Sequence, residues 1–241
     1  NIGGNTDDGN KNDTNTTNTV KDSVIIAIGS EPETLDPTKG WGHGNSPIIQ
    51  STLVKYNAEL NFENDLATGY ELSEDGLTWT FTIRDDAFFT EAEDVAFTLE
   101  TAKAANGSFD LTYMESAVAQ DDTTVVITLS KPTSIFLNTL ASVGIVPEHA
   151  YGDDYGTKPI GSGPYKLVEW RPQEQLMFTA NENYYGGVPE IKNVTVVFMS
   201  EDAALAAVQA VFFQFFPVFK HISHRLFAFF QITVFSALSL S

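Results

Sequence analysis

The sequence predicts a mixed α/β fold of the α+β type, because strand and helix patterns follow one another without a strict β-α-β alternation. The clearest strand pattern is "LTWTFTI" at residues 77–83, where apolar residues alternate with threonines after the turn Asp75-Gly76. The clearest helix pattern starts near residue 90, where Val95, Leu99 and Ala102 recur at helical spacing. With 241 residues, the chain is long enough to bury a sizeable core.

The first expected strand is "VIIAIG", which starts the folded sequence at Val24. Its continuous apolar run is typical of a strand that is buried on both faces. Prolines in the following "EPETLDP" favour extended or turn geometry. After the glycine-rich loop "KGWGHGNS", we expect a helix from Pro47 to Tyr56.

The remaining elements are expected from similar patterns. Thr90 is predicted to cap the helix that carries Val95, with Glu93 as its capping-box partner, and Asn106-Gly107 to end that helix. Further strands are expected at 123–129, 165–170, 175–180 and 194–199, and a short helix at 134–142.

Composition excludes several classes of function. A formal net charge of −19 argues against a nucleic-acid partner, whose phosphates require lysine and arginine. The absence of cysteine excludes disulfides and thiolate metal sites. No nucleophile, P-loop or metalloprotease motif is present, so we do not expect an enzyme or a resident cofactor.

The two ends of the sequence differ from its centre. Residues 1–22 are polar and low in complexity, and we expect a disordered tether. There is no initiator methionine or signal-like apolar stretch at the start, which suggests that a leading segment was removed. A tether fits a cell-surface protein with an upstream anchor, although a disordered cytoplasmic tail would look similar.

One loop has the composition of a binding site. In "GWGHGNS", Trp41 and His43 lie between glycines just after the first strand. Ligand sites often use loops on a rigid scaffold, with an aromatic face and a few polar groups. Imidazole is also a common metal ligand. A surface histidine in an unstructured loop is the competing interpretation.

Five stretches, taken in order, resemble one known family. They are "SEPETLDP", "LVKYNAEL…LATGYELSEDGLTWTFTIRDD", "AEDVAFTLE", "PIGSGPYKLVEW" and "NENYYGGVPEIKNVTVVF". Together they are similar to the extracellular solute-binding proteins, family 5, of peptide and nickel ABC importers, over roughly Val24 to Ala210. One departure is "DDAFFTEAEDV", which lacks about five residues of a loop that is usual in the family.

The resemblance implies a fold and a division of the chain. The fold is a two-lobed, type II periplasmic-binding-protein-like fold, of which this sequence holds the first lobe, at 23–210, and lacks the second. Residues 24–53 and 160–210 would form the central sheet, with 54–159 as an inserted subdomain. The family's ligand-contacting loop after "LDP" corresponds to the "GWGHGN" loop. The implied ligand-binding residues are therefore Trp41, His43 and Asn45, with His43 as a possible metal ligand.

The resemblance also implies a function. The chain would capture a small peptide or a nickel chelate outside the cell and deliver it to the permease and ATPase of an ABC importer, with nickel as cargo rather than cofactor. Extracytoplasmic location and anchoring to the membrane follow from the same resemblance. A surface sensor that does not transport, and a non-functional truncated fragment, are the alternatives.

The segment 211–241 departs from both the family and the rest of the chain. It holds Lys220 and Arg225, no acidic residue, and nine of the 18 phenylalanines. Its basic residues interrupt any transmembrane helix, and its phenylalanine pairs do not gather on one face of a surface helix. An altered reading frame from Val211 onward is the interpretation that we favour for this segment.

Overall fold

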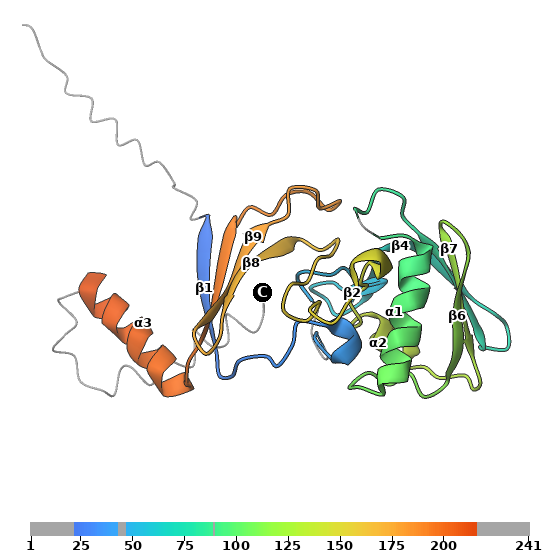
Figure 1. Ribbon diagram of the computed structural model, residues 1–241, viewed down its shortest axis with the longest axis horizontal. Helices are drawn as coiled ribbons and strands as arrows, with labels where there is room; N and C mark the ends of the chain where they lie inside the picture. The colour runs from blue at the N-terminus through green and yellow to red at the C-terminus, as the bar shows by residue number, and fades with distance from the viewer. Residues whose placement is uncertain (1–21, 43–46, 89, 216–241) are drawn as a thin grey trace, which may run out of the picture.

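The computed structural model describes residues 22–42, 47–88 and 90–215, which form two four-stranded sheets, one two-stranded sheet and few helices (Figure 1). The fold is therefore mixed α/β, as predicted. The elements, in chain order, are β1 (Ser23–Ile28), the 3₁₀ turn η1 (Pro37–Lys39), β2 (Val54–Tyr56), β3 (Phe62–Asn64), β4 (Ala67–Leu72), β5 (Thr78–Ile83), α1 (Ala92–Ala105), β6 (Met114–Asp121), β7 (Thr124–Leu129), α2 (Phe136–Leu140), the 3₁₀ turn η2 (Glu148–Ala150), β8 (Tyr165–Arg171), β9 (Gln175–Ala180), β10 (Asn193–Phe198) and α3 (Glu201–Phe215).

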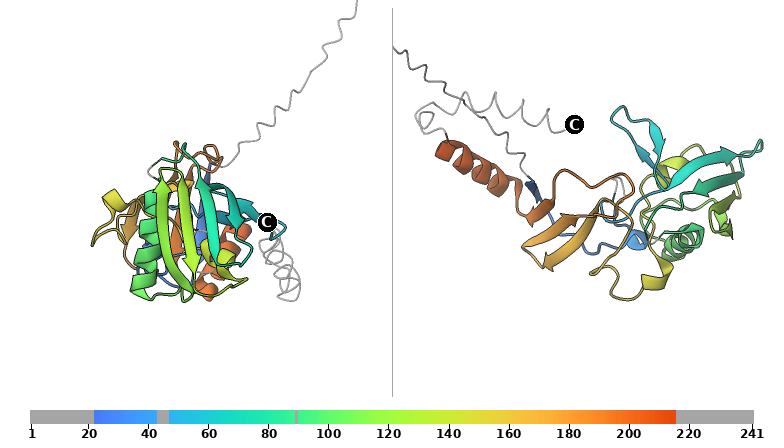
Figure 2. Two further views of the ribbon diagram at one scale, coloured as in Figure 1. Left: turned by 90° about the vertical axis from the view of Figure 1, so that its right-hand side faces the viewer. Right: turned by 90° about the horizontal axis from the view of Figure 1, so that it is seen from above.

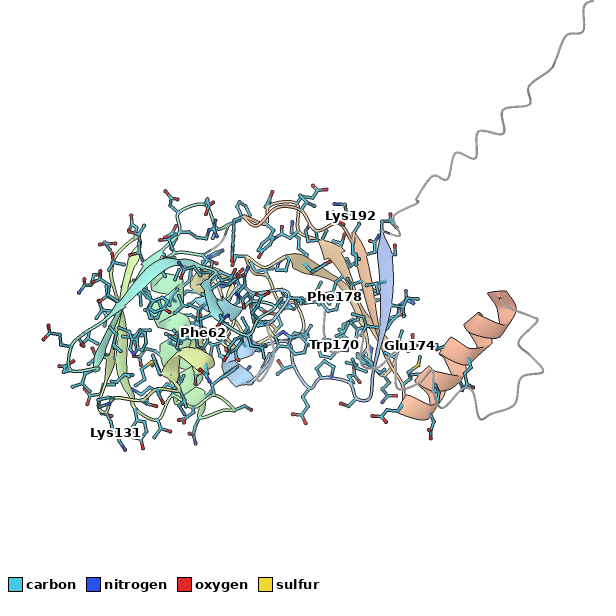
Figure 3. All side chains as sticks on the ribbon, turned by 180° about the vertical axis from the view of Figure 1, so that it is seen from behind. Phe62, Lys131, Trp170, Glu174, Phe178 and Lys192 are labelled. Carbon is cyan, nitrogen blue, oxygen red and sulfur yellow. The ribbon has the colours of Figure 1, made fainter. Side chains whose placement is uncertain are left out.

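The first sheet, called here the β1 sheet, has the order β1-β10-β9-β8. β1 runs parallel to β10, and the other neighbours are antiparallel. Phe178 and Trp170 lie on the face that is turned toward the rest of the molecule (Figure 3). That face holds a small apolar core of Leu35, Ile49, Leu176, Phe178 and Val194.

The expectation that β1 is buried on both faces is wrong. Ile25 is 73% exposed and Ile26 is 44% exposed. Within the described residues β1 is an edge strand that pairs with β10 alone, so one edge and much of one face stay open. A continuous apolar run indicates that a strand can be buried. It does not show that another element of the fold covers that strand.

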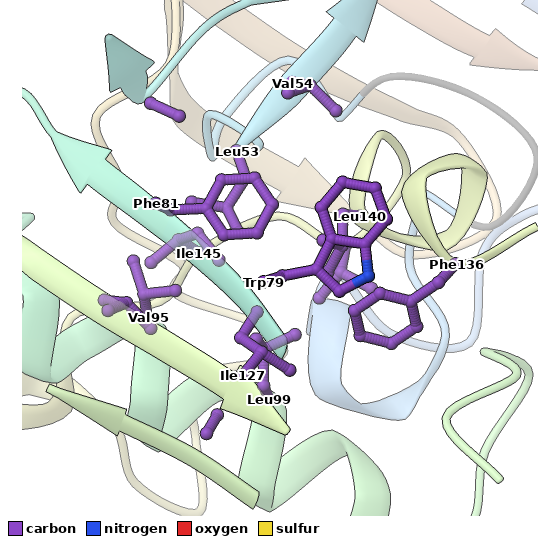
Figure 4. Close-up of a cluster of buried hydrophobic side chains, with 14 of the residues drawn as sticks. Leu53, Val54, Trp79, Phe81, Val95, Leu99, Ile127, Phe136, Leu140 and Ile145 are labelled. Atoms are coloured by element: carbon purple, nitrogen blue, oxygen red, sulfur yellow. The ribbon is translucent and has the colours of Figure 1, made fainter. Parts of the chain in front are cut away.

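The second sheet, called here the β5 sheet, has the order β4-β5-β7-β6 and forms the far end of the molecule (Figure 2, left). On β5, Trp79, Phe81 and Ile83 point inward, as their alternation with threonines predicts. α1 packs against β6 and β7 and buries Val95 and Leu99 in the same core (Figure 4). This core, unlike that of the β1 sheet, is enclosed by elements close in sequence.

The start of α1 differs by one residue from the prediction. The N-cap is Glu91 and not Thr90, and its backbone N–H donates to the Asp94 carboxylate at 2.9 Å. Thr90 is instead buried, and its hydroxyl bonds to Ser162 at 3.0 Å. The helix ends at Asn106 in a left-handed conformation, as predicted.

The predicted helix from Pro47 to Tyr56 is not formed. Residues 48–51 are irregular and β2 follows, because this backbone bonds to distant segments. Ile49 accepts from the Gly163 N–H at 2.8 Å, and Ser51 accepts from the Ile145 N–H at 2.8 Å. Because this segment is enclosed by other parts of the chain, it has no solvent-exposed face. Its apolar residues therefore do not indicate whether it forms a helix.

α3 follows β10 and projects away from the β1 sheet (Figures 1 and 2). It continues through Val211, where the family resemblance ends, to Phe215. No helix among the described residues combines the length and hydropathy that crossing a bilayer requires. The predictions for residues 1–21 and 216–241 lie outside the described residues.

Candidate ligand-binding site

A groove of about 510 Å³ lies between the chain that follows β1 and the inner face of the β1 sheet. We call it the Trp41 groove. Its volume is within the usual range for small-ligand sites. It is lined by Ile28, Pro32, Glu33, Thr34, Lys39, Gly40, Trp41, Gly42, Pro47, Ile48, Leu176, Phe178 and Val196.

Asp36 holds the loop that carries Trp41. Its side chain is fully buried, and Oδ1 accepts from the Thr38 N–H at 3.0 Å and from the Thr38 hydroxyl at 2.8 Å. Its carbonyl oxygen accepts from the Trp41 N–H at 3.1 Å. Because both the side chain and the backbone of Asp36 are engaged, the turn η1 and the residue Trp41 are fixed relative to one another.

The second carboxylate oxygen of Asp36 connects this loop to the middle of the chain. Oδ2 accepts from the Tyr151 hydroxyl at 2.9 Å and lies 3.3 Å from the Lys39 ammonium. The Tyr151 ring packs edge-on against Phe97 of α1. Burial raises the pKa of Tyr151, and the hydrogen bond to Asp36 adds to the shift. The ligand loop is thereby anchored to residues that lie more than a hundred positions away.

Trp41 is half-buried, and its indole packs against the apolar core of the β1 sheet. Its Nε1 is buried and has no hydrogen-bond partner among the described residues. Because this N–H is itself buried, it is the aromatic ring of Trp41 that lines the groove. The other two predicted site residues, His43 and Asn45, lie outside the described residues.

The opposite wall depends on the motif "GSGPY". A Cβ on Gly161 would lie 2.5 Å from the Ile49 carbonyl oxygen, and one on Gly163 would lie 2.6 Å from it. Glycine is required here because the two backbones are in direct contact. The motif thus positions Ile48 and Ile49, and Ile48 lines the Trp41 groove.

The prediction from sequence missed Glu33 and Lys39, which bring one negative and one positive charge to the groove. The sequence offered little indication that these two residues line a binding site, because charged residues near prolines are typical of any exposed turn. Among the described residues no three His, Asp or Glu side chains are grouped to hold a metal ion.

The family described as "Bacterial extracellular solute-binding proteins, family 5 Middle" matches residues 61–211. The chain belongs to this family. The match covers the β5 sheet, α1, and the strands β8 to β10, so it contains the motif that forms one wall of the groove.

Relatives within the family support the assignment. Protein XP55 of Streptomyces lividans is 35% identical over 199 residues, which are 75% of this chain and 36% of that protein. The probable D,D-dipeptide-binding periplasmic protein DdpA of Escherichia coli is 32% identical, over 76% of this chain and 40% of that protein. The chain therefore spans less than half the length of these curated relatives.

A solved structure has a similar fold over the aligned part of its chain. NikZ from Campylobacter jejuni, in complex with Ni(L-His), aligns with a TM-score of 0.74 and 27% identity over 84% of this chain and 46% of NikZ. The architecture described above is therefore part of the fold of type II periplasmic binding proteins. Membership of an extracellular solute-binding family points to an extracytoplasmic location.

Proposed function

We propose that this chain captures a small peptide or a nickel chelate for an ABC importer, and that the ligand lies in the Trp41 groove. The observation that carries the proposal is the loop of Trp41, which a fully buried Asp36 holds over an apolar floor of Leu176 and Phe178. A preorganised loop lowers the entropic cost of binding.

The groove suits a ligand that has both apolar and polar parts. Trp41 offers an aromatic face, and the rim provides the carboxylate of Glu33 and the ammonium of Lys39. A zwitterionic dipeptide presents an amine and a carboxylate that match these two charges. In a histidine chelate of nickel the amine is bound to the metal, so the charge of the metal ion itself would face Glu33, with His43 as an additional ligand of the metal.

The relatives favour these two ligand classes. DdpA is named for binding D,D-dipeptides, and NikZ was solved with Ni(L-His). In a complete importer, the bound ligand would shift the binding protein to a closed form that the permease recognises. The permease and its ATPase are therefore the proposed partners, and an anchor upstream of the tether would hold the protein at the membrane.

The proposal is tested by calorimetric titration of the purified chain with three ligands. These are nickel alone, nickel with free L-histidine, and the dipeptide D-Ala-D-Ala. We expect one of the two ligand classes to bind, and Trp41→Ala to weaken it at least about tenfold, because an aromatic anchor that packs against a ligand contributes strongly to binding.

Matched variants distinguish the loop from the rest of the surface. Trp170→Phe serves as the tryptophan control, since Trp170 does not line the Trp41 groove. For nickel, His43→Ala is compared with His149→Ala, which changes a histidine of η2. Equal losses in both members of a pair, or no binding of any of the three ligands, would contradict the proposal.

A further inference from the structure

A sequence motif that the proposed function does not use lies in the turn after α1. Asn106-Gly107-Ser108 and Asn193-Val194-Thr195 both match Asn-X-Ser/Thr, the acceptor motif of N-linked glycans, and two further matches, at Asn12 and Asn15, lie outside the described residues. Such triplets often arise by chance, so the motif alone selects no site. The structure, however, places the two motifs that it describes in very different surroundings.

The first motif is exposed and irregular. Asn106 is the C-cap of α1, in a left-handed conformation with φ 48° and ψ 43°, and Gly107 and Ser108 follow outside any helix or strand. All three residues are exposed to solvent. The side-chain amide of Asn106 has no hydrogen-bond partner in the described part of the chain, so its nitrogen is accessible to a reacting group.

Few interactions hold this turn in place. Among the described residues, the N–H groups of Gly107 and Ser108 have no hydrogen-bond partner. The turn packs against η1, because a Cβ on Gly40 would lie 2.8 Å from the Ser108 hydroxyl oxygen, and one on Gly107 would lie 3.6 Å from the Thr38 carbonyl oxygen. Opening the turn therefore costs mainly packing contacts, and a local opening of this kind requires much less free energy than global unfolding.

The second motif is part of the β1 sheet. Asn193 and Val194 belong to β10, which pairs with β1 on one side and with β9 on the other. The Asn193 N–H donates to the Asp22 carbonyl at 2.9 Å, and Val194 is only 6% exposed and lies in the core of the sheet. An enzyme can therefore bind this motif as an extended segment only after the sheet has come apart.

We propose that Asn106 accepts an N-linked glycan and that Asn193 does not accept one in the folded chain. The donor is an oligosaccharide on a polyprenyl phosphate carrier, used by a transferase in the extracytoplasmic location that membership of the family indicates. A bond forms between Nδ2 of Asn106 and the anomeric carbon of the first sugar, the bond from that carbon to the carrier phosphate breaks, and the amide releases one proton. The glycan is bulky and hydrophilic, and it would cover the end of α1.

The test uses the purified, folded chain with Asn12→Gln and Asn15→Gln, which remove the two motifs outside the described residues. The chain is incubated with an oligosaccharyltransferase that accepts Asn-X-Ser/Thr and with its lipid-linked oligosaccharide. Intact-mass measurement counts the glycans, and sequencing of the glycopeptides locates them. We expect one glycan on each chain, at Asn106.

Synthetic peptides serve as unfolded controls. They span residues 102–110 and 189–197, and each contains one of the two motifs. Both peptides should accept the sugar, because the proposal assigns the difference between the motifs to the fold. If the peptide 189–197 stays unmodified, its local sequence and not the β1 sheet excludes Asn193, and that part of the proposal is wrong.

Variants of the chain confirm the position of the glycan. Asn106→Gln and Ser108→Ala should each abolish the increase in mass, and Ser108→Ala does so without changing the C-cap of α1. Ser108→Thr keeps the hydroxyl of the motif and should retain the glycan. Asn193→Gln is the matched control and should leave the modification unchanged. Circular dichroism of each variant checks that it is folded.

The outcomes are independent of the ligand that the Trp41 groove binds. An unmodified Asn106 in the folded chain, or equal occupancy of Asn106 and Asn193, would overturn the proposal. Chain purified from the cells that produce it naturally should yield the same glycopeptide, and its absence there would also overturn the proposal. A glycan on Asn106 together with failed titrations of dipeptide and nickel would contradict only the proposed function.

Discussion

The hydroxyl of Tyr185 donates a 2.7 Å hydrogen bond to Oδ1 of Asp65. Tyr185 lies in the connection between β9 and β10, whereas Asp65 lies between β3 and β4, so this bond ties the β1 sheet to the part of the chain that builds the β5 sheet. Asp65 also accepts from the Thr52 N–H through Oδ2 at 3.1 Å, and the Arg84 guanidinium lies 3.6 Å from the centre of the Tyr185 ring. The motif "NENYYGG" therefore acts as a clamp between the two sheets.

The first prediction concerns this clamp. Tyr185→Phe is expected to lower the free energy of unfolding by about 1–3 kcal/mol, because it removes a part-buried hydrogen bond to a charged acceptor and leaves that oxygen of Asp65 with the Lys55 ammonium at 3.4 Å alone. Urea denaturation followed by circular dichroism measures the change. Tyr113→Phe is the control, since Tyr113 is 38% exposed; its effect should stay within about 0.5 kcal/mol. Equal losses in the two variants would refute the clamp.

The second prediction concerns the contact of Gly163 with Ile49. Gly163→Ala is expected to destabilise the fold by about 1–3 kcal/mol, because its Cβ would force two backbones apart in a packed region. Gly152→Ala is the matched control, as a Cβ there would meet no atom within 4 Å. Thermal unfolding of the two variants compares them directly. If both melt at the temperature of the unaltered chain, the proposed need for glycine at 163 is wrong.

The third prediction is a loss of stability in alkaline solution. Burial raises the pKa of Tyr151, Tyr155 and Tyr185 above the ordinary value of 10.0, so the folded state retains protons that the unfolded state releases. Their contribution is therefore fully present below about pH 10 and declines as the pH rises beyond it. Urea denaturation at increasing pH measures this decline, and tyrosinate absorbance reports the ionisation.

A variant assigns the alkaline effect. Tyr155→Phe removes one of the titrating groups, so the dependence of its unfolding free energy on pH above 10 should be shallower than that of the unaltered chain. Tyr113→Phe, which changes an exposed tyrosine, should leave the dependence unchanged. A slope that is the same in both variants would mean that Tyr155 ionises as readily in the folded chain as in the unfolded one.

Elements with a solvent face were predictable from the sequence. One face lies in the core and the other in water in the strands β5 and β7 and in α1. Apolar residues therefore recur at the spacing of a strand or a helix in these segments. β1 and residues 47–53 were not predictable in the same way. The exposure of β1 depends on what neighbours it, and the path of residues 47–53 depends on contacts with Gly163 and Ile145, which are distant in sequence.

The site was predictable only where a residue type is unusual. Trp41 between two glycines is rare enough to draw attention, and it does line the groove. Glu33 and Lys39 resemble ordinary surface charges, and the function of Asp36 in the loop becomes visible only through Tyr151, more than a hundred residues further along the chain.

The last prediction compares two substitutions of Asp36, one that removes its hydrogen-bonding group and one that keeps the shape of the side chain but removes its charge. Asp36→Ala leaves the buried Thr38 N–H without its acceptor and leaves the Tyr151 hydroxyl with the Thr38 hydroxyl alone, so we expect a loss of about 1–3 kcal/mol. Asp36→Asn keeps one oxygen for Thr38 and presents its amide to the Tyr151 oxygen, which can accept. Its loss of stability should therefore be smaller.

Because the loop still folds in Asp36→Asn, ligand binding should be closer to normal in this variant than in Asp36→Ala. Denaturation and the titrations proposed above measure both effects, with Asp154→Asn, at an exposed pair with Lys158, as a control that should change neither. If Asp36→Ala binds ligand as well as the unaltered chain does, the buried carboxylate does not position Trp41, and the groove must be organised by the other residues that line it.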